Sequence, residues 1–343
     1  MKFIISYLSI FCLAFALSLV IGCDNASKQS EKNDQSGQVK NNTEKRRFIS
    51  IGTGTLGGAF HRVGGAIADV ISRNITDKDW EVTAEGTNGT QENIRLIVRE
   101  DATLEFAIAN AAISYFAVRG EGAWQTEQPI HSVMTLAPNV GIFVTQKSSG
   151  IQSIADFKGK RVVVGPAGAG FEYFLKPILA EHGVTYEDFS PLNAKYSAAA
   201  DLLADGSAAA AFMGGAIPTP AITQVSTTQD ITFVPFEEAS KKALFEKYPF
   251  FNPITIPVDA YEKVLTEPFD TMNVGSMHII TAANADEDMV YHFTKILYTH
   301  RAEVVKAHKA GKAINEKNAV KDVGTPFHAG AIRFYREIGI WNE

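Results

Sequence analysis

Four glycines, Gly52, Gly54, Gly57 and Gly58, follow a short apolar run and together could hold an anion on the main chain. Glycine takes positive φ values readily and lets a ligand approach the backbone closely. The residues after these glycines have apolar side chains at helical spacing, so a helix is expected to begin here. A helix N-terminus offers unpaired N–H groups and a partial positive charge, which suit a carboxylate or a phosphate.

Three strands are expected to position this turn and its neighbours. The first is predicted at residues 48–51, directly before the glycines, and two more at residues 80–85 and 104–109. Asn110 stands at the carboxyl end of the third strand, and a polar loop follows the second. In an open α/β sheet ligands bind at the edge where the carboxyl ends of the strands meet, so we expect these three loops to converge on one site.

The loop after the second strand allows two interpretations. Asn88 and Gln91 have the spacing of a capping box, which predicts a helix starting near Gln91. In that case Asn88 and Thr90 serve only to cap the helix. The other interpretation is that both side chains contact a ligand.

The pattern of strand, glycine turn and helix recurs later in the chain. A strand is predicted at residues 162–164, a glycine turn at 165–170 and a helix at 171–182. A further strand at 208–213 ends in Gly214 and Gly215, again at the start of a helix. This repetition predicts a second lobe whose loops face the first.

Two β-prone runs are suited to join such lobes. They lie at residues 140–145 and 273–281, far apart in the chain, as two crossings between lobes require. A long helix is predicted at 286–308 and a final one at 329–338. The pattern predicts an α/β fold of two lobes, with the two crossing strands forming a hinge.

The first glycine turn has three interpretations. Gly52, Gly54 and Gly57 match G-x-G-x-x-G, and Glu85 ends the next strand, so a dinucleotide-binding fingerprint of an exported oxidoreductase is formally present. The turn also suits the first loop of a two-lobed solute-binding protein, or a plain strand-to-helix connection. Recurrence of the turn in the second unit favours the solute-binding protein, because a single cofactor fingerprint does not explain it.

Composition and motifs exclude several function classes. The net charge of −6 argues against nucleic acid as a partner. Eight histidines are scattered without H-E-x-x-H, so no metal site is expected. Neither G-x-S-x-G nor S-x-x-K is present. The sequence therefore predicts a protein that is not an enzyme and carries no cofactor.

The N-terminus predicts an exported lipoprotein. Residues 1–22 have one lysine followed by an uncharged apolar run, and the sequence Val20-Ile21-Gly22-Cys23 resembles a lipobox. Cys23 would carry the lipid, and the polar residues 23–47 would form a flexible tether. The expected location is the periplasmic face of the cytoplasmic membrane.

Seven stretches between Phe48 and Glu337 carry a family resemblance: IGTGTLGGAFHRVGGAIA, VTAEGTNGTQENIRL, LEFAIANAAISYFA, DFKGKRVVVGPAGAGFEYF, AAAAFMGGAIPTPAI, KYPFFNPITIP and HAGAIRFYRE. In this order they resemble the TAXI-type solute receptors of TRAP (tripartite ATP-independent periplasmic) transporters. The resemblance implies a monomeric type II-like periplasmic binding protein. Such a receptor captures a small organic anion (a dicarboxylate, an oxo-acid or an acidic amino acid such as glutamate or 2-oxoglutarate) and delivers it to a TRAP membrane permease.

The resemblance also implies the ligand-binding residues. From the first lobe these are Thr53, Gly54, Thr55, Gly57, Gly58, Ala59, Phe60, Asn88, Gly89, Thr90, Asn93, Asn110 and Ser114, and from the second Gly168, Ala169, Gly170, Gly214 and Gly215. Ala59, Phe60, Ala169 and Phe171 stand where relatives often have hydroxyl-bearing residues, which implies a less polar pocket. His61, Arg62 and Arg95 are candidate partners of a carboxylate. The expected lobe boundaries are 48–138 plus 274–343 for lobe 1 and 139–273 for lobe 2.

Overall fold

The computed structural model describes residues 46–248 and 250–341. The predicted signal peptide, Cys23 and the tether up to residue 45 lie outside the described residues. Within the described ranges, no helix has the length and apolar character needed to cross a membrane.

The first sheet has the strand order β2-β1-β3-β12-β4. β1, β2 and β3 are parallel, whereas β12 pairs antiparallel with both β3 and β4. The carboxyl ends of the three parallel strands therefore meet at one edge, as the sequence predicts. The strands are β1 (Arg47–Gly52), β2 (Trp80–Glu85), β3 (Phe106–Asn110), β4 (Ile130–Thr135) and β12 (Met277–Ala282).

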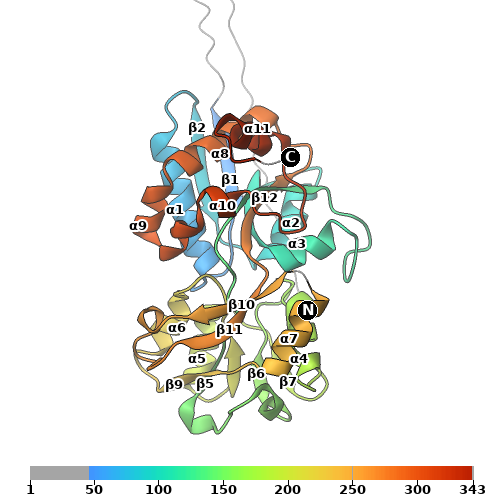
Figure 1. The fold of residues 1–343 in the computed structure, drawn as a ribbon, viewed down its shortest axis with the longest axis vertical. Helices are drawn as coiled ribbons and strands as arrows, with labels where there is room; N and C mark the ends of the chain where they lie inside the picture. The colour runs from blue at the N-terminus through green and yellow to red at the C-terminus, as the bar shows by residue number, and fades with distance from the viewer. Residues whose placement is uncertain (1–45, 249, 342–343) are drawn as a thin grey trace, which may run out of the picture. The chain divides into compact units, whose positions relative to one another are not determined.

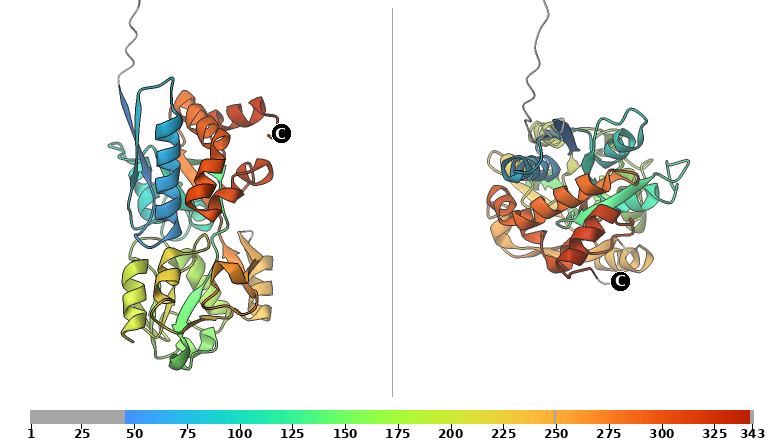
Figure 2. Two further views of the ribbon diagram at one scale, coloured as in Figure 1. Left: turned by 90° about the vertical axis from the view of Figure 1, so that its left-hand side faces the viewer. Right: turned by 90° about the horizontal axis from the view of Figure 1, so that it is seen from above.

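Helices cover both faces of this sheet because its central strand is apolar on both sides. In β3, Phe106 and Ile108 pack into one cluster with α1 (Ala59–Asn74), α8 (Glu287–Thr299) and α11 (Ala329–Glu337). Ala107 and Ala109 point to the other cluster, with α2 (Thr90–Val98) and α3 (Ala111–Ala117). Figure 2 shows α1 and α8 side by side on the first of these faces.

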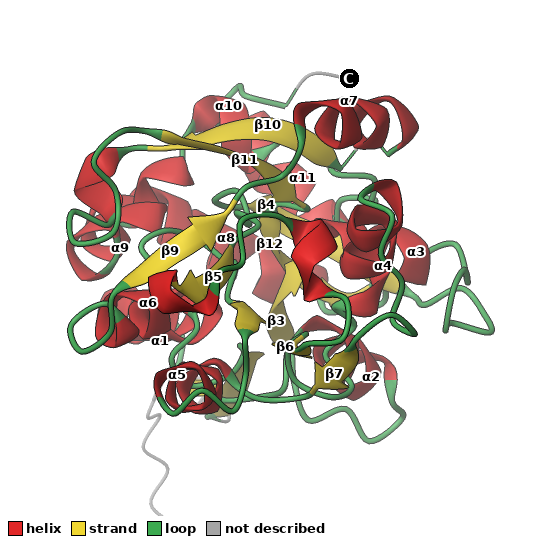
Figure 3. Cartoon of the chain, turned by 90° about the horizontal axis from the view of Figure 1, so that it is seen from below, coloured by secondary structure: helices red, strands yellow, loops and turns green. Residues whose placement is uncertain are grey.

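The second sheet has the order β7-β6-β8-β5-β9 and is built in the same way (Figures 1 and 3). β6 runs parallel to β7 and β8, and β5 runs antiparallel to β8 and β9. Its strands are β5 (Phe143–Gln146), β6 (Arg161–Val163), β7 (Ser190–Leu192), β8 (Ala210–Phe212) and β9 (Ile231–Val234). Its helices are α4 (Glu172–Glu181), α5 (Tyr196–Ala204), α6 (Pro220–Val225) and α7 (Glu238–Lys247). The α/β fold of two lobes is thus confirmed, whereas the exact lobe boundaries stay a prediction.

Two segments connect the sheets: residues 136–142 between β4 and β5, and residues 235–276 between β9 and β12, the second of which ends in β11 (Phe269–Val274) and residues 275–276. The sequence predicted one late strand over 273–281, which is wrong. β11 pairs with β10 (Phe251–Ile256) in a separate ribbon, and the chain bends at Gly275, whose φ is +105°. A side chain there would place its Cβ 2.5 Å from Asn110 Oδ1, so only glycine fits the bend.

The predicted long helix over 286–308 is also wrong, because it is two helices. α8 ends at Thr299 and α9 (Arg301–Ala307) begins after His300, whose backbone N–H closes the last turn of α8. α9 packs against α1. The remaining short elements are α10 (Glu316–Ala319), η1 (Lys147–Ser149), η2 (Ile154–Phe157), η3 (Val258–Ala260) and η4 (Lys309–Ala313).

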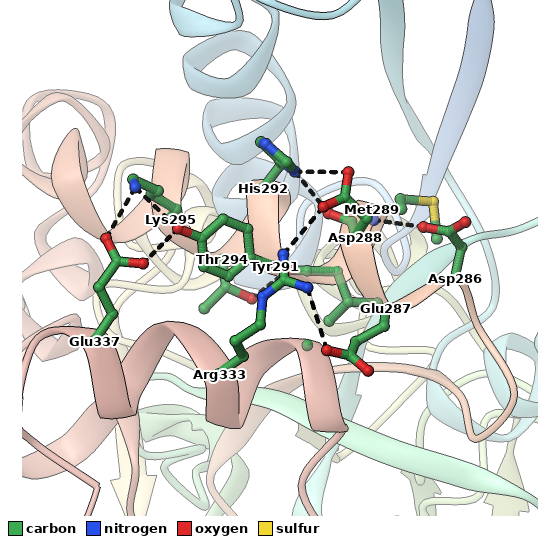
Figure 4. A network of polar contacts seen from close by, with 12 residues as sticks. Asp286, Glu287, Asp288, Met289, Tyr291, His292, Thr294, Lys295, Arg333 and Glu337 are labelled. Atoms are coloured by element: carbon green, nitrogen blue, oxygen red, sulfur yellow. Dashed lines mark hydrogen bonds and ion pairs between the residues drawn. The ribbon is translucent and has the colours of Figure 1, made fainter.

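An ion-pair network joins α8 to α11 on the surface (Figure 4). Arg333 of α11 reaches Glu287 at 3.2 Å and Asp288 at 3.0 Å, and Lys295 of α8 reaches Glu337 at 2.9 Å. These side chains are about half exposed, so each pair contributes at most about 1 kcal/mol. The helix pair is held mainly by the close packing beneath the network.

Gly330 is the point of closest packing between α8 and α11. A Cβ there would lie 2.3 Å from the Glu287 carbonyl oxygen, which is rigid backbone. We expect Gly330→Ala to lower the free energy of unfolding by about 1–3 kcal/mol, because the helices must separate. Urea unfolding followed by circular dichroism measures the change. Gly65→Ala in α1 is the control: its Cβ meets nothing within 4 Å, so unfolding becomes up to about 1 kcal/mol harder. Equal effects of the two variants would contradict the prediction.

Candidate functional site: a cavity between the two sheets

A cavity of about 460 Å³, counting its open mouth, lies at the carboxyl ends of the parallel strands of the first sheet. Both lobes and the segment joining them contribute its walls. The lining residues are Gly54, Thr55, Gly58, Ala59, Phe60, Asn88, Gly89, Thr90, Asn110, Asn139, Phe171, Phe174, Tyr196, Gly214 and Gly215.

The turn between β1 and α1 forms one wall. Gly58 is the N-cap residue of α1, and no side chain caps this helix. The Gly58 N–H donates to the Thr55 carbonyl at 3.0 Å, which folds the turn tightly against the helix start. The first turn of a 16-residue helix therefore faces the cavity with its positive dipole end uncapped by side chains.

The start of α2 forms a second wall, and the predicted capping box is wrong. The N-cap residue is Gly89, with φ of +121°, and the Asn88 side chain does not cap the helix. Instead the Glu92 carboxylate accepts from the Asn88 backbone N–H at 2.7 Å, and the Thr87 hydroxyl accepts from the Gly89 N–H at 3.1 Å. The loop is thus held by its own backbone, which leaves the Asn88 amide without a hydrogen bond among the described residues.

Asn110 forms the floor, where β3 gives way to α3. Its Oδ1 accepts from the N–H groups of Ala112 and Ile113, at 2.8 and 3.3 Å, and so caps α3. Its Nδ2 donates to the carbonyls of Val274 and Gly275, at 3.1 and 3.0 Å. All four hydrogen bonds of this amide are therefore made within the protein, and they tie the first lobe to the second crossing.

The second lobe adds aromatic rings and a glycine pair. Phe171 and Phe174 lie at the start of α4, with ring centroids 5.2 Å apart. The Tyr196 hydroxyl donates to the Gly214 carbonyl at 2.5 Å, and burial raises the pKa of this phenol far above its usual value. Tyr196 is therefore a neutral wall residue. Together with the first-lobe residues, this makes a cavity with no charged side chain in its lining.

A family model described as the NMT1-like family matches residues 51–339 of the chain. The chain belongs to the NMT1-like family. The match spans both sheets and both crossings, so the family assignment covers the whole cavity and not one lobe alone. The finer resemblance to TAXI-type receptors stays a prediction.

Solved structures share the fold of this NMT1-like protein. A protein from Bordetella bronchiseptica RB50 superimposes with a TM-score of 0.52 at 13% identity, over 84% of this chain and 88% of that one. The binding-protein component of an ABC phosphonate transporter from Pseudomonas aeruginosa gives 0.50 at 11% identity, over 80% and 90%. At such low identity the likeness concerns the fold alone, which is that of a type II periplasmic binding protein, as predicted.

Eleven of the predicted site residues of the NMT1-like protein lie together around the cavity. Whether they bind a ligand stays a prediction. They are Gly54, Thr55, Gly58, Ala59, Phe60, Asn88, Gly89, Thr90, Asn110, Gly214 and Gly215.

Seven predicted residues do not line the cavity, and three of these support its walls by polar contacts. Asn93 is fully buried and donates to the carbonyls of Thr53 and Ile108, both at 2.9 Å. The Thr53 hydroxyl in turn donates to a carbonyl at the end of β2 at 2.7 Å. The Ser114 hydroxyl lies 2.9 Å from the Nε2 atom of buried His278, within hydrogen-bond distance.

The other four lie where the lobes touch. The Gly57 carbonyl accepts from the N–H of Ala221 in α6 at 3.0 Å. Residues 168–170, which the sequence placed in the site, meet the start of α2 instead, where the Ala169 carbonyl accepts from the Gln91 N–H at 3.2 Å. These hydrogen bonds join the two lobes.

The candidate charged partners of a carboxylate lie elsewhere. His61 Nδ1 is 3.4 Å from the Thr53 hydroxyl, and the Arg95 guanidinium lies 5.7 Å from the Trp124 ring. Neither they nor Arg62 line the cavity. Across residues 46–248 and 250–341 there is also no group of three or more His, Cys, Asp or Glu that could hold a metal ion.

Four lining residues are not predicted from the sequence: Asn139, Phe171, Phe174 and Tyr196. Phe171 was noticed only as a departure from related sequences. The other three have no motif: Asn139 precedes a β-prone run, and Phe174 and Tyr196 read as ordinary core residues of helices. Only the packing of the lobes brings them to the cavity.

Proposed function

We propose that this protein is the extracytoplasmic solute receptor of a membrane transporter, and that it binds a small organic anion in the cavity between its lobes. The observation that carries the proposal is the cavity itself. Two helix starts without side-chain caps, those of α1 and α2, line it next to residues of the second lobe. Such helix ends favour an anion through their N–H groups and dipoles.

The transporter is proposed to be of the TRAP type, with a TAXI-family receptor, on the basis of the sequence resemblance. The predicted lipid anchor at Cys23 would hold the receptor on the periplasmic face of the cytoplasmic membrane. The resemblance makes dicarboxylates, oxo-acids and acidic amino acids, including glutamate and 2-oxoglutarate, the first solutes to test. The partner would be a TRAP permease subunit, and the receptor itself would act as a monomer.

Hinge closure is the proposed mechanism. Backbone hydrogen bonds join the lobes beside the cavity: the Gln91 N–H donates to the Ala169 carbonyl, and the Ala221 N–H donates to the Gly57 carbonyl. These bonds must break when the lobes part around the two crossings. A solute that touches both lobes would stabilise the joined form and shift the population towards it, and the permease would recognise that form.

The dinucleotide fingerprint finds little support in the geometry. Gly57, the last glycine of the motif, has its carbonyl bonded to Ala221, and a Cβ there would lie 3.2 Å from the Ser197 backbone nitrogen. This glycine therefore allows the second lobe to approach. In a dinucleotide site the corresponding glycine serves packing of the helix and strand within one unit.

A thermal-shift screen of the mature chain tests the proposal. The panel holds C4–C6 mono- and dicarboxylates, oxo-acids and amino acids, with NAD and NADP as controls. A solute present at about 100 times its Kd adds about 2.7 kcal/mol to the stability, which raises Tm by several degrees. Small-angle scattering of the same mixtures should show compaction. A response to NAD or NADP alone would overturn the proposal.

A further inference from the structure

We infer that the solute is a singly charged organic acid with an apolar body, and that Asn139 is the side chain that selects it. This inference rests on the proposed function, since it concerns the same cavity. It narrows the solute class by the charge, the aromatic surface and the unused hydrogen-bonding groups of the lining.

The charge of the lining matches one carboxylate. No lining side chain is ionised at neutral pH, so the positive potential comes from helix ends alone. A helix start carries roughly half an elementary charge, and the Glu92 carboxylate in the first turn of α2 offsets the charge of that start, so the starts of α1 and α2 together suit at most one carboxylate. The second carboxylate of a dicarboxylate would lose its hydration without gaining a partner, which is strongly unfavourable.

The second lobe offers the solute an apolar surface. α4 has no side-chain cap either, but Phe171 and Phe174 face the cavity there, and the preceding backbone of residues 168–170 does not. These rings are fixed in place. Phe171 packs on the backbone of Gly165, where an added Cβ would lie 2.3 Å from the Phe171 ring. The ring centroids of Phe174 and Phe212 are 5.4 Å apart. A rigid aromatic wall suits an aliphatic or aromatic body.

Three of the six polar side chains of the lining, those of Thr90, Asn110 and Tyr196, already make hydrogen bonds within the protein. Asn110 makes its four hydrogen bonds within the protein, and the Thr90 hydroxyl accepts from the Asn110 N–H at 2.9 Å. These two residues build the floor. They have little capacity left to distinguish one solute from another.

Asn139 differs from these residues because its backbone N–H and C=O make hydrogen bonds and, within residues 46–248 and 250–341, its side chain makes none; the Asn88 amide also lacks a partner there but is more exposed. The Asn139 N–H donates to Asn273 Oδ1 at 3.0 Å, and its carbonyl accepts from the Val274 N–H at 2.8 Å. The residue is only 6% exposed, yet its amide has no partner among the described residues. Its polar atoms are not among the fully enclosed ones that lack a partner, so they are accessible from the cavity, where a solute that accepts a hydrogen bond from the amide can take the place of water.

The position of Asn139 gives this contact a second consequence. It lies on the first crossing, next to Val140, which bridges to Gly215 of the second lobe and to Asn273 of the second crossing. A carboxylate bound by Asn139 would therefore contact the protein at the point where both connections between the sheets meet. The carboxamide of Asn139 is uncharged and does not repel an anion. Replacing it with a carboxylate, which does, tests the contact directly.

Isothermal titration calorimetry of the mature chain compares two monocarboxylates, hexanoate and 3-phenylpropanoate, with two dicarboxylates, adipate, which has the same length as hexanoate, and glutamate. We expect each monocarboxylate to bind at least roughly tenfold more tightly than adipate. Asn139→Asp should weaken the monocarboxylates by roughly ten- to a hundredfold, and Asn139→Ala by about tenfold, because a hydrogen bond to a charged group is lost. Tm without solute should change little in Asn139→Ala, since the side chain has no partner to lose, whereas Asn139→Asp should lower it, because a carboxylate at this nearly buried position loses hydration.

Asn252→Asp in β10 is the matched control, because Asn252 lies outside the cavity lining and the change adds the same charge. It should leave every affinity as in the unaltered protein. Tightest binding of adipate or glutamate, or unchanged monocarboxylate binding in Asn139→Asp, would overturn this inference while the receptor proposal stands. Binding of none of the four anions would count against both.

Discussion

Replacing Asn110 with Asp is expected to lower the free energy of unfolding by about 3–5 kcal/mol, although the two side chains have the same shape. The amide donates to the Val274 and Gly275 carbonyls in a site that is 2% exposed. A carboxylate cannot donate, so it would face two carbonyl oxygens without water. The connection at residues 274–276 would lose the bonds that hold it to the first lobe.

Asn273→Asp is the control for this change, because Asn273 lies on the same crossing. Its Nδ2 donates to the Ser276 hydroxyl at 3.1 Å, and its Oδ1 accepts from the Asn139 N–H. A hydroxyl can turn and donate to a carboxylate, so the control should cost about 1 kcal/mol. Urea unfolding at pH 7 measures both variants. Similar losses in the two would show that the donor role of Asn110 is not what holds the crossing.

A second large effect is expected from pH, through buried histidine. His278 is fully buried in β12 between the hydroxyls of Ser132 and Ser114, at 3.3 and 2.9 Å, and burial lowers its pKa to about 3. In the unfolded chain its pKa returns to about 6.5. Between these values the unfolded state binds the proton and the folded state does not, so stability falls as the pH falls. From pH 7 to pH 5 His278 alone should cost about 2 kcal/mol.

Burial also lowers the pKa of four other histidines, so their contributions have the same sign: His131, His182, His308 and His328. The carboxylates with lowered pKa act differently. Asp156, whose pKa is lowered mainly by the N–H groups of Gln152 and Ser153, loses its contribution only below its ordinary range near 4. Measurements between pH 7 and pH 5 therefore isolate the histidines.

Urea unfolding at pH 7, 6 and 5 measures this dependence. His278→Gln should flatten the curve, because glutamine does not titrate but still bonds both hydroxyls. Ser114→Ala should shift the curve down without changing its slope, since it removes a hydrogen bond and leaves the titrating group. A His278→Gln curve as steep as that of the unaltered protein would refute the role of His278.

Local patterns allowed the edge of the first sheet to be predicted closely. The strand at 48–51 is a short apolar run, the strand at 80–85 alternates apolar and polar residues, glycines follow both, and Asn110 marks the end of the third strand. Residues 273–281 were expected to be one strand because Gly275 and Ser276 interrupt an otherwise β-prone run only briefly. The bend there depends on Asn110, which is far away in the chain.

The sequence by itself determined the α/β class, the repeated glycine turns and the expectation of a site where they meet. These follow from backbone preferences and side-chain periodicity, which act over a few residues. The tertiary structure decided which residues share the cavity, among them Asn139 and Tyr196, and which serve as supports, such as Asn93. It also decided that the lining carries no charged side chain. Such properties depend on contacts between distant segments, so no local pattern records them.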